Sequence, residues 1–221
     1  MTNRIFILAC VIPCAIVSIA PAQDCSRDIN YYLGQVTSFK STEDSAELIP
    51  IMKCISSPVW SYVEHPDSFW SADFNVSIYE KTWRNYLSVI KVLIPLTKSS
   101  IDSLRLETAA ALAYYGFPPS DQILKNYPDG PFKAVLFAIL NDTTTIGWVQ
   151  DRYDEAQAQA QINPEFSERD RMIYLGLLYH IAMPRAIPFL NRLIKYEASD
   201  KLKAAAIKAE ERIKTLHPEI K

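Results

Sequence analysis

The sequence predicts an all-α protein. Apolar residues recur at the helical spacing of three and four along most of the chain, and no run alternates with the period of two that marks a half-buried strand. Only five glycines occur among 221 residues, and this scarcity favours short turns between helices over the tight hairpins of a sheet protein. Two architectures fit these observations: tandem helical hairpins, or an irregular helical superhelix or bundle.

The first 22 residues have the pattern of a cleavable secretory signal. Arg4 is the lone positive charge, residues 5–19 are mainly apolar, and the small residues Ala20 and Ala22 precede the expected cut. A basic start, a short apolar stretch and small residues at the third and first positions before the cut define such signals. We therefore expect cleavage after Ala22, which leaves residues 23–221 as a single all-helical domain, periplasmic or secreted.

Two other interpretations of this segment stay open. An uncleaved membrane anchor would need about 20 apolar residues, and Pro13 and Pro21 interrupt the stretch. A lipoprotein signal would use Cys10, but little apolar sequence precedes that cysteine. We expect no stable membrane insertion after cleavage.

Two cysteines, Cys25 and Cys54, lie beyond the signal. In an oxidising compartment an even pair is expected to close a disulfide. A loop of this size would stabilise the fold by roughly 3 to 4 kcal/mol in the chain-entropy model. The bridge would pin the mature N-terminus onto the first helical layer.

Charge and motifs exclude several function classes. After the signal, 22 basic and 25 acidic residues remain, a balance that argues against a nucleic-acid surface. The histidines, His65, His180 and His217, lack metal-ligand spacing, and no nucleophile elbow, phosphate loop or dinucleotide fingerprint occurs. The sequence thus predicts no catalytic residue, metal or cofactor, and we interpret His180 as an interior histidine.

Apolar positions define the predicted helices. Four helix faces are marked by Ile29, Tyr32, Leu33 and Val36; by Trp83, Tyr86, Leu87, Ile90 and Ile94; by Val149, Tyr153, Ala156 and Ala160; and by Leu202, Ala206, Ala209 and Ile213. Ser199 and Asp200 are candidate caps for the last helix. Residues 172–183 are apolar nearly all round, broken by Gly176 and His180, so this helix should be central and buried.

Three prolines recur at a regular distance. Pro50, Pro95 and Pro188 each stand inside an apolar helical stretch, and their spacings match one and two periods of about 46 residues. A proline in the middle of a helix costs about 3 kcal/mol unless its kink fits the packing. The recurrence therefore needs an explanation, and a degenerate fourth member is expected near Asn141.

Two stretches follow these prolines with a shared pattern. They are Asp102, Leu104, Arg105, Ala109, Ala111, Leu112 and Gly116 after Pro95, and Asp200, Leu202, Lys203, Ala205, Ala206 and Ile213 after Pro188. With these residues the chain resembles the HEAT-repeat family of α-solenoids, whose first helix often carries a proline and whose second begins near an Asp. The resemblance implies a helical-hairpin array or an armadillo-like bundle. Residues 56–80 depart from the pattern, so the repeat count and the irregular-bundle alternative stay open.

The segment 56–83 is the candidate binding region. Rigid aromatics alternate here with carboxylates, and such mixtures line sugar or peptide grooves. The candidate binding residues are Trp60, Glu64, His65, Trp70 and Asp73. A cap that covers the exposed end of a helical array is the competing interpretation.

Two functions are compatible with these features. The first is an exported, non-catalytic protein-binding module, for example an inhibitor or immunity-type protein that acts on a secreted partner. The alternative is a hydrolase or a carbohydrate- or cell-wall-binding protein that uses segment 56–83. Hydrolysis would need two of Glu64, Asp67 and Asp73 about 5 to 9.5 Å apart across a cleft. The sequence predicts no oligomeric state.

Overall fold

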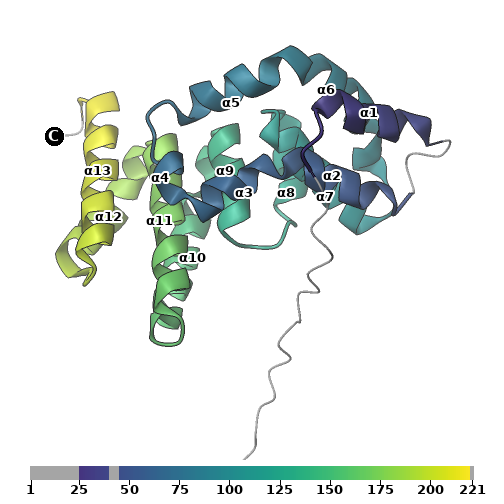
Figure 1. Cartoon of the computed structure of the whole chain (residues 1–221). Coiled ribbons are helices and arrows are strands. Elements are labelled where there is room, and N and C mark those ends of the chain that lie inside the picture. The colour runs from purple at the N-terminus through teal and green to yellow at the C-terminus, as the bar shows by residue number, and fades with distance from the viewer. Residues whose placement is uncertain (1–24, 40–44, 220–221) are drawn as a thin grey trace, which may run out of the picture.

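The computed structural model describes residues 25–39 and 45–219, and within these ranges helices and turns occur but no strand (Figure 1). The predicted all-α fold class is confirmed. The predicted signal, residues 1–22, lies outside the described residues. Of the helices in the two described ranges, none combines the length and apolar character needed to cross a bilayer.

The first half of the chain builds one end and the centre of the molecule (Figure 1). Its elements are α1 (Ile29–Ser38), α2 (Leu48–Ser56), α3 (Pro58–Glu64), α4 (Pro66–Phe69), α5 (Phe74–Thr82), η1 (Trp83–Asn85), α6 (Tyr86–Leu93), η2 (Ile94–Lys98), α7 (Asp102–Tyr114), η3 (Pro118–Ser120), α8 (Asp121–Leu124) and α9 (Pro131–Leu140). Helix α2 packs on α7, and α3 packs on α9.

The second half forms the opposite end. Its elements are η4 (Thr143–Thr145), α10 (Ile146–Ala158), η5 (Gln159–Gln161), α11 (Pro164–Ile181), η6 (Pro184–Ala186), α12 (Ile187–Tyr196) and α13 (Asp200–Leu216). Helix α11 packs on α4, α9, α10 and α13, and α12 packs on α13. Buried apolar side chains from both halves form a continuous core.

Two of the three recurrent prolines lie in the first turn of a helix, and the third lies where α6 continues into η2. Pro50 is the third residue of α2, while Pro95 and Pro188 are the second residues of η2 and α12. The first four N–H groups of a helix have no partner within it, so a proline in the first turn forfeits no hydrogen bond. The expectation of mid-helix prolines was therefore wrong for Pro50 and Pro188, whereas Pro95 does stand inside a continuous helical run, at its change from α-helix to 3-10 helix.

The helices predicted after Pro95 and Pro188 begin at the expected residues. Helix α7 starts at Asp102 and α13 at Asp200. Ser199 caps α13, because its side-chain oxygen accepts the N–H of Leu202 at 3.4 Å. Helix α9 ends next to Asn141, which adopts the left-handed conformation at φ 51°.

Helix α11 is central and buried, as predicted. Residues 171–179 are all buried, and a close approach of α4 explains Gly176. A Cβ at this glycine would lie 2.7 Å from two ring carbons of Phe69, nearer than packed atoms tolerate. The Phe69 ring therefore occupies the space that a side chain at position 176 would need.

Cys25 and Cys54 form the predicted disulfide, with their Cα atoms 4.9 Å apart. The bridge ties the residues before α1 to α2, and these two helices also contact each other. The predicted inward residues of α1, Tyr32, Leu33 and Val36, are buried beside it. The described N-terminal residues are thus held on the first helical layer.

Candidate binding groove

The predicted binding segment divides into two parts with different environments. Residues of α3 and α4 pack inward, and Trp70 is buried with its Nε1–H donating to the carbonyl of Met172 at 3.1 Å. Its ring packs against Tyr179, with centroids 5.3 Å apart. This part packs over α9 and α11, in the middle of the molecule (Figure 1).

The other four predicted binding residues do not line one common cleft. Trp60 is half exposed and packs on the Phe132 ring at 4.8 Å, while Glu64, His65 and Asp73 are exposed. Glu64 lines a cavity that contains none of the other four predicted residues, and its further lining is Pro66, Pro164, Glu165, Phe166, Glu168, Arg169 and Lys201.

The carboxylates proposed for hydrolysis are likewise spread out. Glu64 is on α3, Asp67 on α4 and Asp73 just before α5, and all three are exposed. The cavity at Glu64 includes neither of the two aspartates. The chemistry of a carboxylate pair therefore finds no support in this cavity.

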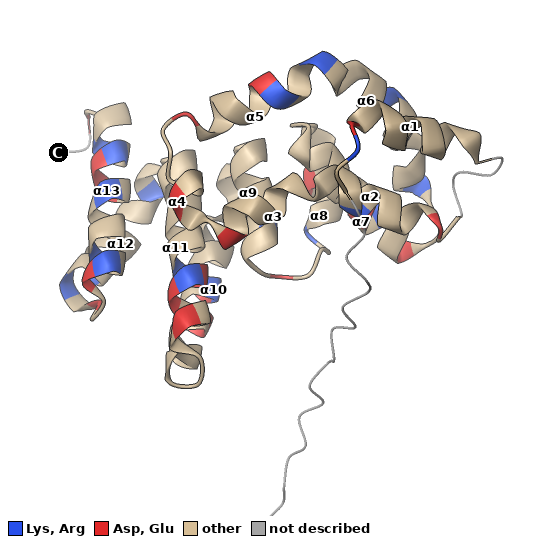
Figure 2. Cartoon of the chain, viewed as in Figure 1, with Lys and Arg blue, Asp and Glu red and all other residues tan. Residues whose placement is uncertain are grey.

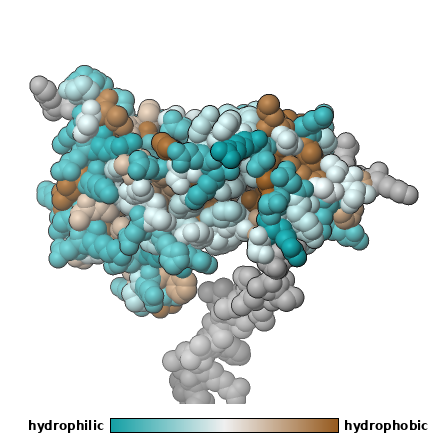
Figure 3. All heavy atoms as spheres, turned by 45° about the horizontal axis from the view of Figure 1, so that its top comes forward, coloured by the Kyte–Doolittle hydropathy of each residue, from teal (hydrophilic) through white to brown (hydrophobic). Residues whose placement is uncertain are grey.

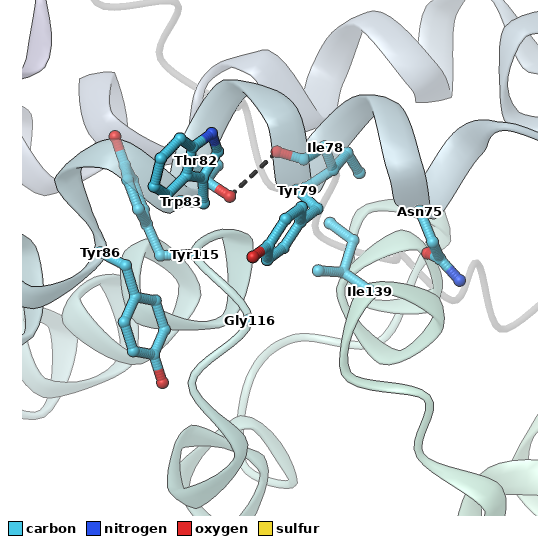
Figure 4. Close-up of a pocket in the computed structure, with 9 residues that line it drawn as sticks. All are labelled: Asn75, Ile78, Tyr79, Thr82, Trp83, Tyr86, Tyr115, Gly116 and Ile139. Atoms are coloured by element: carbon cyan, nitrogen blue, oxygen red, sulfur yellow. Dashed lines mark hydrogen bonds between the residues drawn. The ribbon is translucent and has the colours of Figure 1, made fainter.

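An open cavity lies beside the second part of the segment. It has a volume of about 620 Å³ and is lined by Asn75, Ile78, Tyr79, Thr82, Trp83, Tyr86, Tyr115, Gly116 and Ile139 (Figure 4). One wall is the continuous run of α5, η1 and α6, and the other comes from the ends of α7 and α9. We call this cavity the groove, and residues 74–98, from α5 to η2, the strap.

Gly116 keeps one side of the groove open. It adopts φ 73° after α7 and donates its N–H to Ala113, while Phe117 donates to Leu112. This is a left-handed C-terminal cap, in which a residue with a side chain would be strained. A Cβ built on Gly116 would meet no heavy atom within 4 Å, so the space in front of it belongs to the groove.

The walls of the groove are mainly apolar and aromatic. Thr82 turns its polar group away, because its Oγ1–H donates to the carbonyl of Ile78 in its own helix at 2.9 Å. Burial, and then the neighbouring Tyr114, raise the pKa of Tyr115 well above its usual range. Its hydroxyl therefore stays protonated and able to donate a hydrogen bond.

The polar side-chain groups of the groove lining are hydroxyls, one amide and one indole N–H. The lining holds no aspartate, glutamate or histidine. Within residues 25–39 and 45–219, no group of three or more His, Cys, Asp or Glu side chains is placed to hold a metal ion. The arrangement is suited to binding a mostly apolar object.

An exposed apolar stripe runs along the strap beside the groove. Its members are Val76, Tyr79, Trp83, Leu87 and Ile94, which are 55%, 65%, 51%, 78% and 36% exposed. Their spacing of three, four, four and seven residues keeps them on one helical face. Figure 3 shows apolar surface gathered over this part of the molecule.

The helix face that Trp83, Leu87 and Ile94 mark in the sequence is therefore largely exposed to solvent. The inward contacts of α6 come from Val89 and Leu93, which are fully buried. The strap carries apolar residues on two faces, and this doubled pattern is the sequence signal for the stripe. Tyr115 and Ile139 have no such signal, because they belong to other helices.

Comparisons of the chain with family models, with curated proteins and with solved structures found no match.

Proposed function

We propose that the chain is an exported, non-catalytic binding module that holds a segment of a protein partner in the groove. The observation that carries this proposal is the apolar stripe beside an open, aromatic-lined cavity. Contiguous exposed apolar surface is unfavourable in water and commonly marks an interaction site. Tyrosine and tryptophan, which supply much of the groove, are enriched among residues that dominate binding energy.

The dimensions of the groove favour a helical segment as the bound object. From Asn75 to Tyr86 the strap extends about 17 Å at the helical rise per residue. This length equals roughly three turns, enough for anchors at positions i, i+3, i+4 and i+7 of a partner helix. Such anchors would enter between Trp83 on the strap and Ile139 on the opposite wall.

The location and architecture belong to the same proposal. Residues 1–22 resemble a signal, and the Cys25–Cys54 bridge suits an oxidising compartment. The pairs of α12 with α13 and of η2 with α7 are consistent with HEAT-like hairpins. An inhibitor or immunity-type protein that covers a secreted partner is the specific version that we favour.

A carbohydrate is the second candidate ligand for the same groove. The half-exposed rings of Tyr79 and Trp83 present flat faces on which sugars stack, and the hydroxyls of Tyr86 and Tyr115 can bond to a polar rim. Because the lining holds no carboxylate, this candidate is a binding protein and not a hydrolase.

The proposal is tested by selecting displayed helical peptides on the wild-type protein and measuring their affinity for two variants. We expect Trp83→Ala to weaken selected peptides at least about tenfold, as a hot-spot residue would. Trp60→Ala is the matched control, because Trp60 is equally exposed but lies outside the groove, and it should retain binding.

Three outcomes would contradict the proposal. In the first, no peptide is enriched. In the second, the two tryptophan variants lose affinity equally. In the third, soluble oligosaccharides bind in a Trp83-dependent manner while peptides do not. The last outcome would establish the carbohydrate candidate.

A further inference from the structure

The strap carries a charge opposite to that of the whole chain. Between residues 76 and 98 it has four basic residues, Lys81, Arg84, Lys91 and Lys98, and one acidic residue, Glu80, whereas the complete sequence has a net charge of −2. In Figure 2, basic segments recur along the run from α5 to α6. This local excess of positive charge lies on the same elements as the apolar stripe.

The four basic residues are exposed and lack ionic partners. In the described part of the chain, no acidic side chain forms an ion pair with any of them. Some exposed cations elsewhere do have partners: Lys201 with Glu168 at 3.4 Å and Lys214 with Glu210 at 2.7 Å. Among the residues that the structure describes, the positive charge of the strap thus has no carboxylate partner.

The basic residues run parallel to the stripe. Arg84 follows Trp83 directly, and its guanidinium lies 5.9 Å from that ring. Lys91 follows Arg84 by seven residues, which is about two helical turns. Leu87 follows Trp83 by four residues, which is about one turn, so the basic row and the apolar row run in the same direction along the strap. A ligand on the stripe would therefore contact apolar side chains and meet Arg84 and Lys91 at its edge.

We infer that the segment held in the groove is an acidic amphipathic helix of the partner. This inference rests on the proposed function and names the chemistry of the bound segment. Apolar anchors of that helix would enter the groove, and its Asp and Glu side chains would face Arg84 and Lys91. Complementary charge of this kind steers association and selects the partner.

Two other occupants fit less well. An anionic bilayer also attracts basic amphipathic surfaces, but it is flat on the scale of the strap and would leave the groove unfilled. A second copy of the chain, docked stripe to stripe about a two-fold axis, would bring two basic rows together. Like charges opposed in this way are unfavourable.

The test uses two synthetic 18-residue helical peptides with the same apolar face and with polar faces of either glutamate or lysine. Fluorescence anisotropy measures their binding to the wild-type protein at low and high salt. We expect the acidic peptide to bind about tenfold more tightly than the basic one, and less tightly as salt increases.

The second part of the experiment reverses one charge on the strap. Arg84→Glu should weaken the acidic peptide about three- to tenfold and strengthen the basic one. Lys195→Glu is the matched control, since Lys195 is an exposed cation 4.9 Å from the exposed ring of Tyr196. It lies on α12, outside the groove, and should change binding less than twofold.

Each remaining outcome overturns the inference. If both peptides bind equally and Arg84→Glu changes nothing, the acidic character is wrong while the binding groove stands. If neither peptide binds, the helix-binding function fails with it. Binding of wild-type protein to phosphatidylglycerol vesicles, lost in Arg84→Glu, would identify a membrane surface instead, and concentration-dependent dimerisation that excludes peptide would identify a second copy.

Discussion

The strap and the helices α10–α13 handle apolar and charged groups differently. On the strap, exposed apolar residues form one stripe, and the cations form no ion pair within residues 25–39 and 45–219. On α10–α13, exposed apolar residues are scattered over separate elements and several cations pair with carboxylates, as Arg192 does with Asp154 at 2.7 Å. The comparison teaches that the second region is organised for stability, while the strap keeps unsatisfied groups that a partner can satisfy.

A buried polar cluster is the strongest sign of this organisation. Glu197 accepts hydrogen bonds at Oε2 from the Tyr153 hydroxyl at 2.7 Å and from Arg171 at 3.1 Å. Its Oε1 accepts the N–H groups of Ala198 and Ser199. These contacts join α10 and α11 to the turn between α12 and α13.

The largest effect is expected from breaking this cluster. Glu197→Ala leaves the Arg171 charge buried without its partner, and the free energy of unfolding should fall by about 3 to 5 kcal/mol. Urea unfolding measures this loss of free energy. The matched strap variant Glu80→Ala removes an exposed carboxylate and should stay within about 0.5 kcal/mol of wild type. Equal losses of unfolding free energy in the two variants would contradict the difference between α10–α13 and the strap.

A pH dependence of about 3 kcal/mol is expected from His180. Its Nε2–H donates to the carbonyl of Phe69 at 2.5 Å. Burial, opposed by this hydrogen bond and aided by the charges of Arg212 and Lys208, lowers its pKa to about 4. The unfolded chain therefore binds an extra proton between pH 6.5 and pH 4, and stability should fall as the pH falls through this window.

His180→Gln provides the control for this titration, because the amide still donates a hydrogen bond but does not ionise. The difference in unfolding free energy between wild type and variant should shrink or reverse from pH 7 to pH 4. A difference that stays constant with pH would show that His180 does not titrate as described.

A smaller loss, about 1 to 3 kcal/mol, is expected for Gly176→Ala. The new methyl group would collide with the Phe69 ring and push α4 away from α11. Gly147→Ala is the matched control on α10, where an added Cβ meets no atom within 4 Å. That variant should be neutral or gain up to about 1 kcal/mol from helix propensity. Thermal unfolding of both proteins decides whether α4 is tightly packed against α11.

The smallest effect is expected on the stripe itself. Leu87→Ser exposes no new surface, because Leu87 is already 78% exposed. Its free energy of unfolding should change by no more than about 0.5 kcal/mol. A loss of 2 kcal/mol or more in urea unfolding would mean that the stripe belongs to the core.

Sequence reasoning succeeded where the determinants were local. The apolar run around Gly176 predicted a buried central helix, Ser199 and Asp200 predicted the start of α13, and the cysteine pair predicted the disulfide. It failed at Pro50 and Pro188, because apolar flanks do not distinguish a helix interior from its first turn.

The candidate site was only partly predictable. Segment 56–83 contains Tyr79 and Trp83, but its composition does not distinguish them from Trp70, which Gly176 admits into the core. The opposite wall comes from Tyr115, which follows α7, and Ile139 of α9, and only tertiary packing brings them to the strap. Periodicity identifies a helix face, but it does not reveal whether protein or water covers that face.

Hydrogen exchange of the full chain with and without saturating acidic helical peptide tests the central claim most directly. We expect slower exchange across residues 74–98 and around Gly116, with little change on α12 and α13. Protection confined to α10–α13, or no protection at peptide concentrations well above the dissociation constant, would contradict the assignment of the strap as the binding face.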